Sequence, residues 1–333
     1  SKQLSEVLPE NIDYNDLMLK ILSHENVASR AAVYESYDKN VQGRVVNERG
    51  KTNAGVVAPF DSKKFPKEIK NDCFSAALAH NPSIGKVDPY LVAQHAVLEA
   101  CAKTVSVGSS PLALTDCLCF GNPEKPEQMW QFSQSCIAIR EACDLLHFNG
   151  TDNLPIVAGN VSFYNQSGDQ SIPASPMIGC FGKVSKEKIL TNGFVGSDSN
   201  LYLLGENPLF IGGSVAANVL NTKNTKIEKF DVQKYSNMLN SVLEANAASL
   251  LNSCSYVGLG GLATALFKMS FINDIGCDIK DQKDKNLLFS ENLSFVVEVS
   301  EKNSSSFEAV LNEKGCKYKQ IGKTNDSNKI VVK

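Results

Sequence analysis

The sequence of 333 residues has no apolar run that approaches the roughly 18 residues of a membrane-spanning helix. Its start, SKQLSEVLPEN, is too polar for a signal peptide. A surplus of positive charge is also missing, because 33 Lys and Arg stand against 36 Asp and Glu, for a net charge of -3. A dedicated nucleic-acid binder needs a basic surface to neutralise phosphates. We therefore expect a protein that binds neither membranes nor nucleic acids.

Other familiar chemical signatures are missing too. The ten cysteines form no CxxC pair, and the chain is large enough to fold without disulfides, so we expect reduced, mostly buried thiols in a cytoplasmic protein. The four histidines, His24, His80, His95 and His147, have no metal-ligand spacing, and His95 fits a helix surface or a core better than a base. No G-x-x-x-x-G-K-[ST] sequence occurs, so any ATP chemistry must use another phosphate cradle.

Length and composition favour two globular domains. Hydrophobic residues make up 43% and charged residues 21%, which provides for a sizeable core. The segment SKEKILTNGFVGSDSN is polar and rich in Gly and Ser, and we place the boundary inside it. The expected units are a lead-in over 1–27, a domain over 28–184 and a second domain over 185–333.

Strand and helix patterns alternate along the first domain. We predict helices over 11–23, 28–40, 88–105 and 126–146, and strands over 54–60, 73–79, 112–120, 154–164 and 175–184. The strands over 54–60 and 73–79 are expected to be buried, and Trp130 is expected to pack its helix onto the sheet. Short polar connections between such elements are typical of an α/β or α+β domain.

The second domain shows the same alternation. We predict strands over 201–205, 293–300 and 329–333, and helices after Gly213, over 231–251, over 262–271 and over 306–315. The whole chain is therefore expected to be α/β (α+β) with two domains.

Asp116 is the first candidate for chemistry. It lies in LALTDCLCF, an apolar segment that we interpret as a central strand, and a buried carboxylate needs a partner or a cation. Asn122, Glu124 and Lys125 follow at a strand-to-helix junction, where such sheets often bind ligands. A capped turn with a structural Asp explains the same residues. Cys117 and Cys119 share a strand face, and core packing explains them better than a metal site does.

A second run, AGNVSFYNQS, repeats this arrangement. Gly159 permits a close approach of the backbone, and Asn160, Ser162 and Asn165 offer oxygen ligands for a phosphate or a hydrated Mg²⁺. An ordinary turn is the alternative.

Two glycine motifs are weaker signals. Gly258-Leu-Gly-Gly-Leu-Ala263 matches G-x-G-x-x-A with Asp278 twenty residues on, but the preceding NSCSY is a poor strand, so we do not expect dinucleotide binding. Gly212-Gly213-Ser214 suits either an anion at a helix N-terminus or a simple turn.

Four segments together resemble the phosphoribosylformylglycinamidine synthase family. They are TDCLCFGNPEKPEQMWQF, VASRAAVYESYD, HAVLEACAKTVSVGSSPLALTD and PIVAGNVSFYNQS, and the resemblance continues more weakly to Lys333. The family carries two copies of a fold shared with aminoimidazole ribonucleotide synthetase. Its catalytic His motifs, of the SEHCSYK and SHNHP kind, lie in the first copy, and neither occurs here. The resemblance is therefore to the second copy, and it implies no catalytic residue in this chain.

The resemblance implies roles for residues already singled out. Asp116 and Gly159 match positions that contact ATP, Asn160 a position that holds Mg²⁺, and Ser162 a position that contacts the substrate. The implied reaction is ATP-dependent amidation of formylglycinamide ribonucleotide in purine biosynthesis, by a ligase completed by two partners. These are the catalytic first half and a glutaminase that supplies ammonia, so a homo- or hetero-oligomer is expected, inactive without the catalytic half. A catalytically inactive structural or regulatory paralogue is the alternative.

Family members also hold an auxiliary nucleotide with Mg²⁺, and here the sequence departs. At the positions that the resemblance implies as metal ligands, only Glu99 keeps the residue of the family. The other positions are occupied by Ala79, Lys103, Tyr256 and Leu259. Glu99 and Lys103 are spaced for an i,i+4 ion pair on one helix face. The hypothesis is that this site no longer holds Mg²⁺, although Lys103 could still neutralise a phosphate of a metal-free nucleotide.

Overall fold

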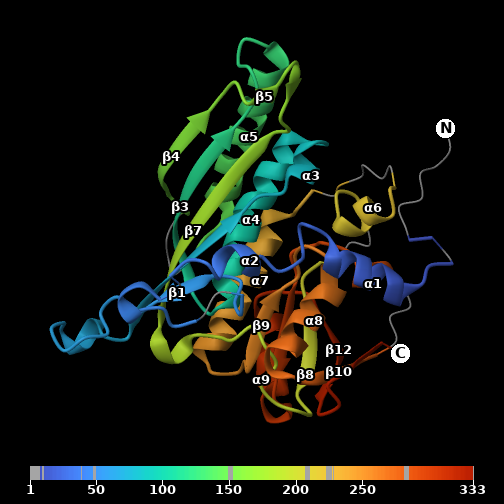
Figure 1. Cartoon of the computed structure of the whole chain (residues 1–333). Helices are drawn as coiled ribbons and strands as arrows, with labels where there is room; N and C mark the ends of the chain where they lie inside the picture. Colours follow the sequence, from blue (N-terminus) through green and yellow to red (C-terminus); the bar gives the residue numbers. More distant parts are fainter. Residues whose placement is uncertain are drawn as a thin grey trace.

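The computed structural model describes residues 8–9, 11–38, 40–47, 50–148, 153–206, 211–222, 227, 229–280 and 285–332. These residues form two mixed sheets with helices packed against them (Figure 1). The first sheet comes from the N-terminal half of the chain and the second from the C-terminal half. The predicted two-domain α/β (α+β) class is confirmed.

The first sheet has the strand order β1-β2-β7-β3-β4. Strands β3 and β4 run parallel, joined by a helical crossover, and the other neighbouring pairs are antiparallel. The strands span Gly55–Val57 (β1), Asp72–Ala79 (β2), Ser110–Cys119 (β3), Ile156–Ser162 (β4) and Ser175–Ser185 (β7), and a hairpin pairs Gln166–Ser167 (β5) with Gln170–Ser171 (β6).

Helices α4, Pro89–Ser106, and α5, Pro126–Leu145, pack on one side of the first sheet (Figure 1). Both were predicted, and both begin with the proline at the first helical position. All but two residues of α4 are buried, because the helix contacts strands β2, β3 and β7 on one side and elements of the second domain on the other. Helix α4 therefore forms the wall that the two domains share.

The other side of the first sheet has no helix layer in the described part of the chain, although the ring of Phe60 packs against Phe74 there. Along β2, Cys73 and Ala77 are buried, whereas Phe74 and Leu78 are exposed, Leu78 by 74%. Both were predicted to lie in a buried strand, and that prediction is wrong because helices cover only one face. We call the uncovered side the open face. Its large apolar side chains are Val57, Phe74, Leu78, Met177 and Phe181.

Three other local predictions are wrong. The helix expected over 28–40 is only Ala31–Tyr34 (α2), which buries no side chain, and a helix without packing is marginal in water. The strand expected over 54–60 is limited to β1. Trp130 does not pack α5 onto the sheet, because its side chain is 56% exposed.

The second sheet has the order β13-β10-β12-β8-β11-β9 and helices on both faces. Its strands span Asn200–Leu204 (β8), Ser253–Tyr256 (β9), Gly276–Ile279 (β10), Phe295–Val299 (β11), Tyr318–Asn325 (β12) and Ile330–Val332 (β13). Side chains alternate along β8, so Tyr202 and Leu204 join one core cluster while Leu201 and Leu203 join the other. The strands are consequently buried on both sides.

Each face of this sheet has its own helix layer. Helices α7, Val232–Ala247, and α9, Ser304–Glu313, share a cluster with the first domain. The opposite layer consists of α1 (Tyr14–Ser23), α6 (Val215–Val219) and α8 (Gly261–Asn273). Helix α1 belongs to the predicted lead-in, yet it contacts α6 and α8 of the second domain. The remaining short helix, α3, is Pro82–Gly85.

Strands β9, β10 and β12 were not predicted. The sequence NSCSY is a poor strand by its composition, but it contains β9, and the Ser253 hydroxyl donates to the buried Glu298 carboxylate over 2.8 Å. A buried hydroxyl costs little once it has such a partner. Residues 207–210 lie outside the described residues. They belong to the segment between the strand predicted over 201–205 and the helix expected after Gly213.

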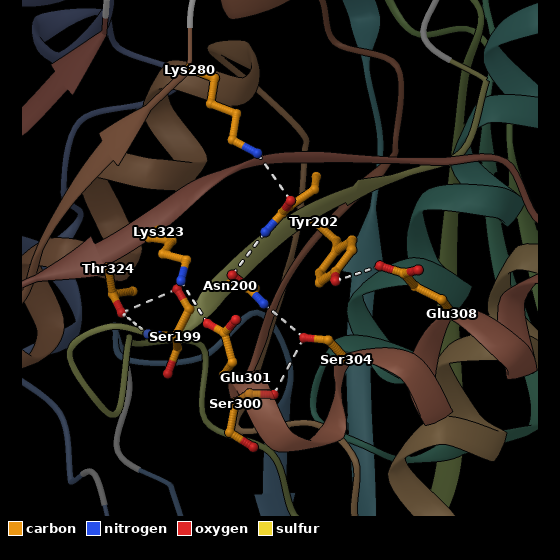
Figure 2. Close-up of polar contacts among 11 residues, drawn as sticks. Ser199, Asn200, Tyr202, Lys280, Ser300, Glu301, Ser304, Glu308, Lys323 and Thr324 are labelled. Atoms are coloured by element: carbon orange, nitrogen blue, oxygen red, sulfur yellow. Dashed lines mark hydrogen bonds and ion pairs between the residues drawn. The ribbon is translucent and has the colours of Figure 1, made fainter.

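Polar side chains attach α9 to the second sheet (Figure 2). Asn200 donates from Nδ2 to Ser304 Oγ over 2.7 Å, and its Oδ1 accepts from Gln320 over 2.8 Å. Tyr202 donates from its hydroxyl to Glu308 over 2.7 Å. These contacts satisfy polar groups within a largely buried sheet, and we assign them a structural role.

The N-cap of α4 provides a test of the fold. The Asp88 side chain accepts from the backbone N–H groups of Tyr90 and Leu91 over 2.8 and 2.9 Å. We predict that Asp88→Ala lowers the free energy of unfolding by about 1 kcal/mol in urea titrations. Asp88→Asn keeps the acceptor and should stay near wild type. Equal losses in both variants would contradict the capping role.

Candidate functional site

Asp116 and Gly159 lie directly opposite each other on the parallel strands β3 and β4. A Cβ placed on Gly159 would stand 2.2 Å from Asp116 Oδ1, so the carboxylate rests against the glycine backbone. Partial burial raises the pKa of Asp116, and a hydrogen bond from the backbone N–H of Asn160 opposes that rise. The structure thus brings together the two residues that the sequence linked to ATP.

Asn160 and Ser162 follow on β4. They lie opposite Cys117 and Cys119, and Asn160 is exposed. Because side chains alternate along a strand, these residues are on the open face, whereas Asp116 is on the side of α5. The four residues therefore meet along one edge of the sheet, but not on one face of it.

The neighbouring loops hold this edge together. Asn165 donates from Nδ2 to the carbonyl oxygens of Phe120 and Ser162 over 3.0 and 2.8 Å, so it ties the ends of β3 and β4. Asn122 accepts from the backbone N–H of Glu124 over 2.9 Å, which is the capped turn considered as an alternative. Glu124 and Lys125 are exposed.

The residues of the auxiliary metal position also come together, as a buried polar cluster between the domains. Glu99 on α4 is 3% exposed, and its Oε1 lies 3.0 Å from Lys103 Nζ. Tyr256 on β9 donates from its hydroxyl to the same oxygen over 3.1 Å. Lys103 Nζ also donates to the carbonyl of Leu78 over 2.8 Å and lies 5.6 Å from the centroid of the Tyr256 ring. We call Glu99, Lys103 and Tyr256 the Glu99 cluster.

This cluster does not fit a divalent cation. Burial alone would raise the pKa of Glu99, but the charge of Lys103 and the hydrogen bonds from Lys103 and Tyr256 hold it below its usual value. An ammonium group therefore already neutralises the carboxylate. Ala79 is buried and Leu259 packs against the core of the second domain, so neither contributes an oxygen. Mg²⁺ sites need several hard oxygen ligands.

A cavity of about 290 Å³ lies beside the Glu99 cluster, between the two domains. His95 of α4 lines one side, and burial lowers the pKa of its imidazole, which favours the neutral form. Its Nδ1 lies 3.7 Å from Glu99 Oε2. Phe230 and Tyr235 supply aromatic walls, and the lysines of the lining are Lys229, Lys234 and Lys317.

Glu291 contributes a carboxylate to the same cavity. Its Oε1 accepts from the backbone N–H groups of Val215 and Gly260, each over 2.8 Å, where α6 and α8 begin. Burial raises the pKa of Glu291 to about 7, although these two hydrogen bonds oppose the rise. Ser214 caps α6 itself, accepting from Ala217 N over 3.1 Å, so the Gly212-Gly213-Ser214 segment is a simple turn.

The G-x-G-x-x-A motif does join a strand to a helix, since β9 precedes it and α8 follows. A dinucleotide fold requires the next strand to lie parallel beside the first. Here β9 is at one edge of the sheet and β10, which contains Asp278, is near the other. The expectation that the motif binds no dinucleotide thus fits the topology.

Sequence reasoning missed the interdomain cavity and Glu291. The cavity is formed by residues far apart in the chain, and nothing in LLFSENLS marks its glutamate as unusual. Within the described ranges, no group of three or more His, Cys, Asp or Glu side chains is arranged to hold a metal ion. No helix in this part of the chain is long and apolar enough to cross a membrane.

Two family models match the chain. The N-terminal domain of AIR synthase related proteins matches residues 52–184, and the C-terminal domain matches residues 197–333. The phosphoribosylformylglycinamidine synthase subunit PurL of Campylobacter lari is 34% identical over 325 residues, covering 96% of this chain and 43% of the relative. The same subunit of Methanothrix thermoacetophila is 34% identical over 314 residues, covering 91% and 40%.

The fold is also similar to a solved structure, that of Thermotoga maritima PurL complexed with FGAR. The TM-score is 0.70 at 12% sequence identity, and the match covers 96% of this chain and 51% of that one. The chain thus spans about two fifths of the length of the curated relatives it matches. The resemblance stated from the sequence is confirmed.

The Glu99 cluster can be tested by removing its cation. We predict that Lys103→Met lowers the free energy of unfolding by about 3–5 kcal/mol, because Glu99 is left buried without a partner. The double variant Glu99→Gln/Lys103→Met should recover much of the loss, and Lys86→Met, at an exposed lysine, is the control. Urea unfolding measures all three. Mg²⁺ or EDTA should not shift the wild-type midpoint, and a stabilisation by Mg²⁺ would refute the assignment.

The raised pKa of Glu291 predicts how the stability of the chain depends on pH. Its pKa is about 7 in the folded chain against 4.5 for an ordinary glutamate. The contribution of Glu291 to the free energy of unfolding therefore falls as the pH rises from 4.5 to 7 and is constant above that. Glu291→Gln keeps an oxygen for both backbone N–H groups and cannot ionise. Its stability relative to wild type should therefore rise across this window, by at most about 3 kcal/mol. Urea titrations at pH 5 and pH 8 measure the change, with Glu124→Gln as the control, and a pH-independent difference would contradict it.

Proposed function

We propose, because this chain belongs to the AIR synthase-related protein family, that it is the second half of a phosphoribosylformylglycinamidine synthase and completes an active site on a catalytic first half. The reaction is an ATP-dependent amidation. ATP phosphorylates the formamide oxygen of formylglycinamide ribonucleotide, and ammonia then displaces the phosphate, giving the amidine, ADP and phosphate. A glutaminase would supply the ammonia.

The open face is the observation that carries this proposal. A contiguous apolar surface on one side of a sheet is unusual in a monomer and is typical of an interaction site. The second sheet of this chain has helices on both faces, so the missing cover is particular to the first sheet. A similar N-terminal domain would cover the surface with a matching sheet. Asn160 lies at the edge of this face, where two such domains would meet.

Asn160 and Ser162 of β4 would then contribute to the shared site from the open face, while Asp116 of β3 lies on the other side of the sheet. Gly159 makes room for the Asp116 carboxylate, which accepts a hydrogen bond from the backbone N–H of Asn160 and so holds β4 in place for a contact with ATP. The Asn160 side chain would offer an oxygen to Mg²⁺, and the Ser162 hydroxyl a hydrogen bond to the substrate. When bound, Mg²⁺ neutralises the triphosphate. A single amide oxygen can be only a part of such a Mg²⁺ site, and the remaining ligands must come from the partner.

The chain on its own is expected to show no turnover, because it contains none of the catalytic His motifs of the family. We propose that it works in a hetero-oligomer with the catalytic half and the glutaminase. All ten cysteines are free thiols, as suits the reducing cytoplasm, where we place the complex. At the auxiliary position we propose that Lys103 has replaced Mg²⁺.

Reconstitution tests this assignment. Mixed with the catalytic half and a glutaminase, the wild-type chain should give ATP-dependent and glutamine-dependent turnover. Asn160→Ala and Asp116→Asn should each lower kcat by about tenfold to a hundredfold. Asp169→Asn, in the exposed β5-β6 turn, should not change it.

The same assay separates the two candidate functions. Unaltered turnover in both the Asn160 and the Asp116 variants would favour the structural or regulatory paralogue. Gel filtration of each variant with the catalytic half checks that assembly is intact, so that a loss of kcat reports on the site.

A further inference from the structure

Two cysteine thiols stand side by side on the open face. Cys117 and Cys119 are two residues apart on β3, so their side chains point the same way. Their Sγ atoms are 3.8 Å apart, and both residues are free and half-buried. The sequence interpretation placed them in a core, but no layer covers this face in the described chain.

The distance between the sulfur atoms fits one metal ion. Two thiolates on a tetrahedral Zn²⁺, each about 2.3 Å from the metal, are about 3.8 Å apart along the edge of the tetrahedron. The pair as it stands could therefore hold such an ion without a change of backbone conformation. A direct contact between two thiols is the simpler explanation of the same distance.

The residues around the pair strengthen the metal interpretation. Met177 on β7 lies directly across from Cys117, so a thioether, a soft sulfur ligand, is within one strand spacing. On the other side Asn160 of β4 lies across from Cys117 and Ser162 across from Cys119. Three sulfur groups on adjacent positions favour a thiophilic ion over Mg²⁺ or Ca²⁺.

We propose that Cys117 and Cys119 form a binding site for a thiophilic divalent ion such as Zn²⁺, with Met177 beside it. Binding replaces two S–H bonds by two metal–sulfur bonds and releases two protons, so the neutral dithiol becomes a neutral metal dithiolate. The open positions of the ion face solvent. With only two thiolate ligands the site is suited to reversible binding rather than to a permanent structural role.

Accessibility singles out this pair among the cysteines. Seven of the ten are buried, and only Cys117, Cys119 and Cys136 are partly exposed. Cys136 is on α5, which packs on the other side of the sheet. Burial raises the pKa of the Cys119 thiol, and the neighbouring Cys117 raises it further.

Binding would affect the function proposed above, and this consequence rests on that proposal. The ion would sit on the face that the catalytic half must cover, within one residue pair of Asn160. We expect micromolar Zn²⁺ to lower reconstituted turnover, and EDTA, added with Mg²⁺ kept in excess over the chelator, to restore it. An ion bound at this site would then inhibit assembly with the catalytic half or the reaction itself.

Cd²⁺ is the probe for binding, because its bonds to thiolates absorb in the ultraviolet. The full chain, reduced and without partners, should bind one Cd²⁺ with the absorbance of two thiolates, release protons and lose the band when Zn²⁺ competes. Cys119→Ser should halve the absorbance and weaken binding by about tenfold or more. Cys136→Ser is the matched control and should behave as wild type.

A second variant tests the thioether. Met177→Leu keeps the size and the apolar character of the side chain, so it should weaken binding without changing the thiolate absorbance. Absence of the Cd²⁺ band in the wild-type chain, or its persistence in the double variant Cys117→Ser/Cys119→Ser, would overturn the proposal. Because this measurement uses the isolated chain, its result does not depend on the catalytic half. Cd²⁺ binding with turnover unaffected by Zn²⁺ would support the metal site and refute only the inhibitory consequence.

Discussion

The near-complete burial of helix α4 is the constraint on which both domains depend. This helix covers the first sheet, contacts α7 and β9 of the second domain, and carries Glu99 into the interior. A buried carboxylate is tolerated only with a compensating charge and hydrogen bonds. Lys103, one turn along α4, provides the charge, and Tyr256 of the second domain provides a hydrogen bond. The electrostatic requirement of one helix thus adds a polar contact to the apolar cluster that the two domains share.

The two sheets differ in how many of their faces are covered by helices of this chain. The second sheet has a helix layer on each face and is complete within the chain. The first has helices on one face only, and apolar side chains such as Leu78 and Phe181 remain in solvent on the other. Its functional candidates lie at one edge, where β3 and β4 run in parallel. A sheet of this kind provides a rigid support for residues such as Asn160 while leaving the rest of the site to another domain.

The sequence predicted the helices that depend on a local periodic pattern of apolar residues. Helices α4, α5 and α7 have long periodic segments with proline or aspartate at their starts, and all were placed within a few residues. Strands β9, β10 and β12 were missed because their polar residues are satisfied only in the folded chain, as Ser253 is by Glu298. The sequence singled out Asp116 and Gly159 in separate motifs, but their pairing depends on the parallel register of β3 and β4, which was not predicted. The cavity and Glu291 could not be predicted, since they result from contacts between segments distant in sequence.

The lead-in helix shows that order along the chain and order in space differ. Helix α1 precedes the first domain, yet Leu17 and Ile21 are buried in the core of the second, and Leu8 N donates to Asn286 Oδ1 over 2.8 Å. The second folding unit is therefore discontinuous, with the first domain inserted into it. Its outer helix layer is completed by residues synthesised before any of its strands, so a recombinant fragment that starts at the second sheet would expose the apolar side chains of α6 and α8 that Leu17 and Ile21 cover.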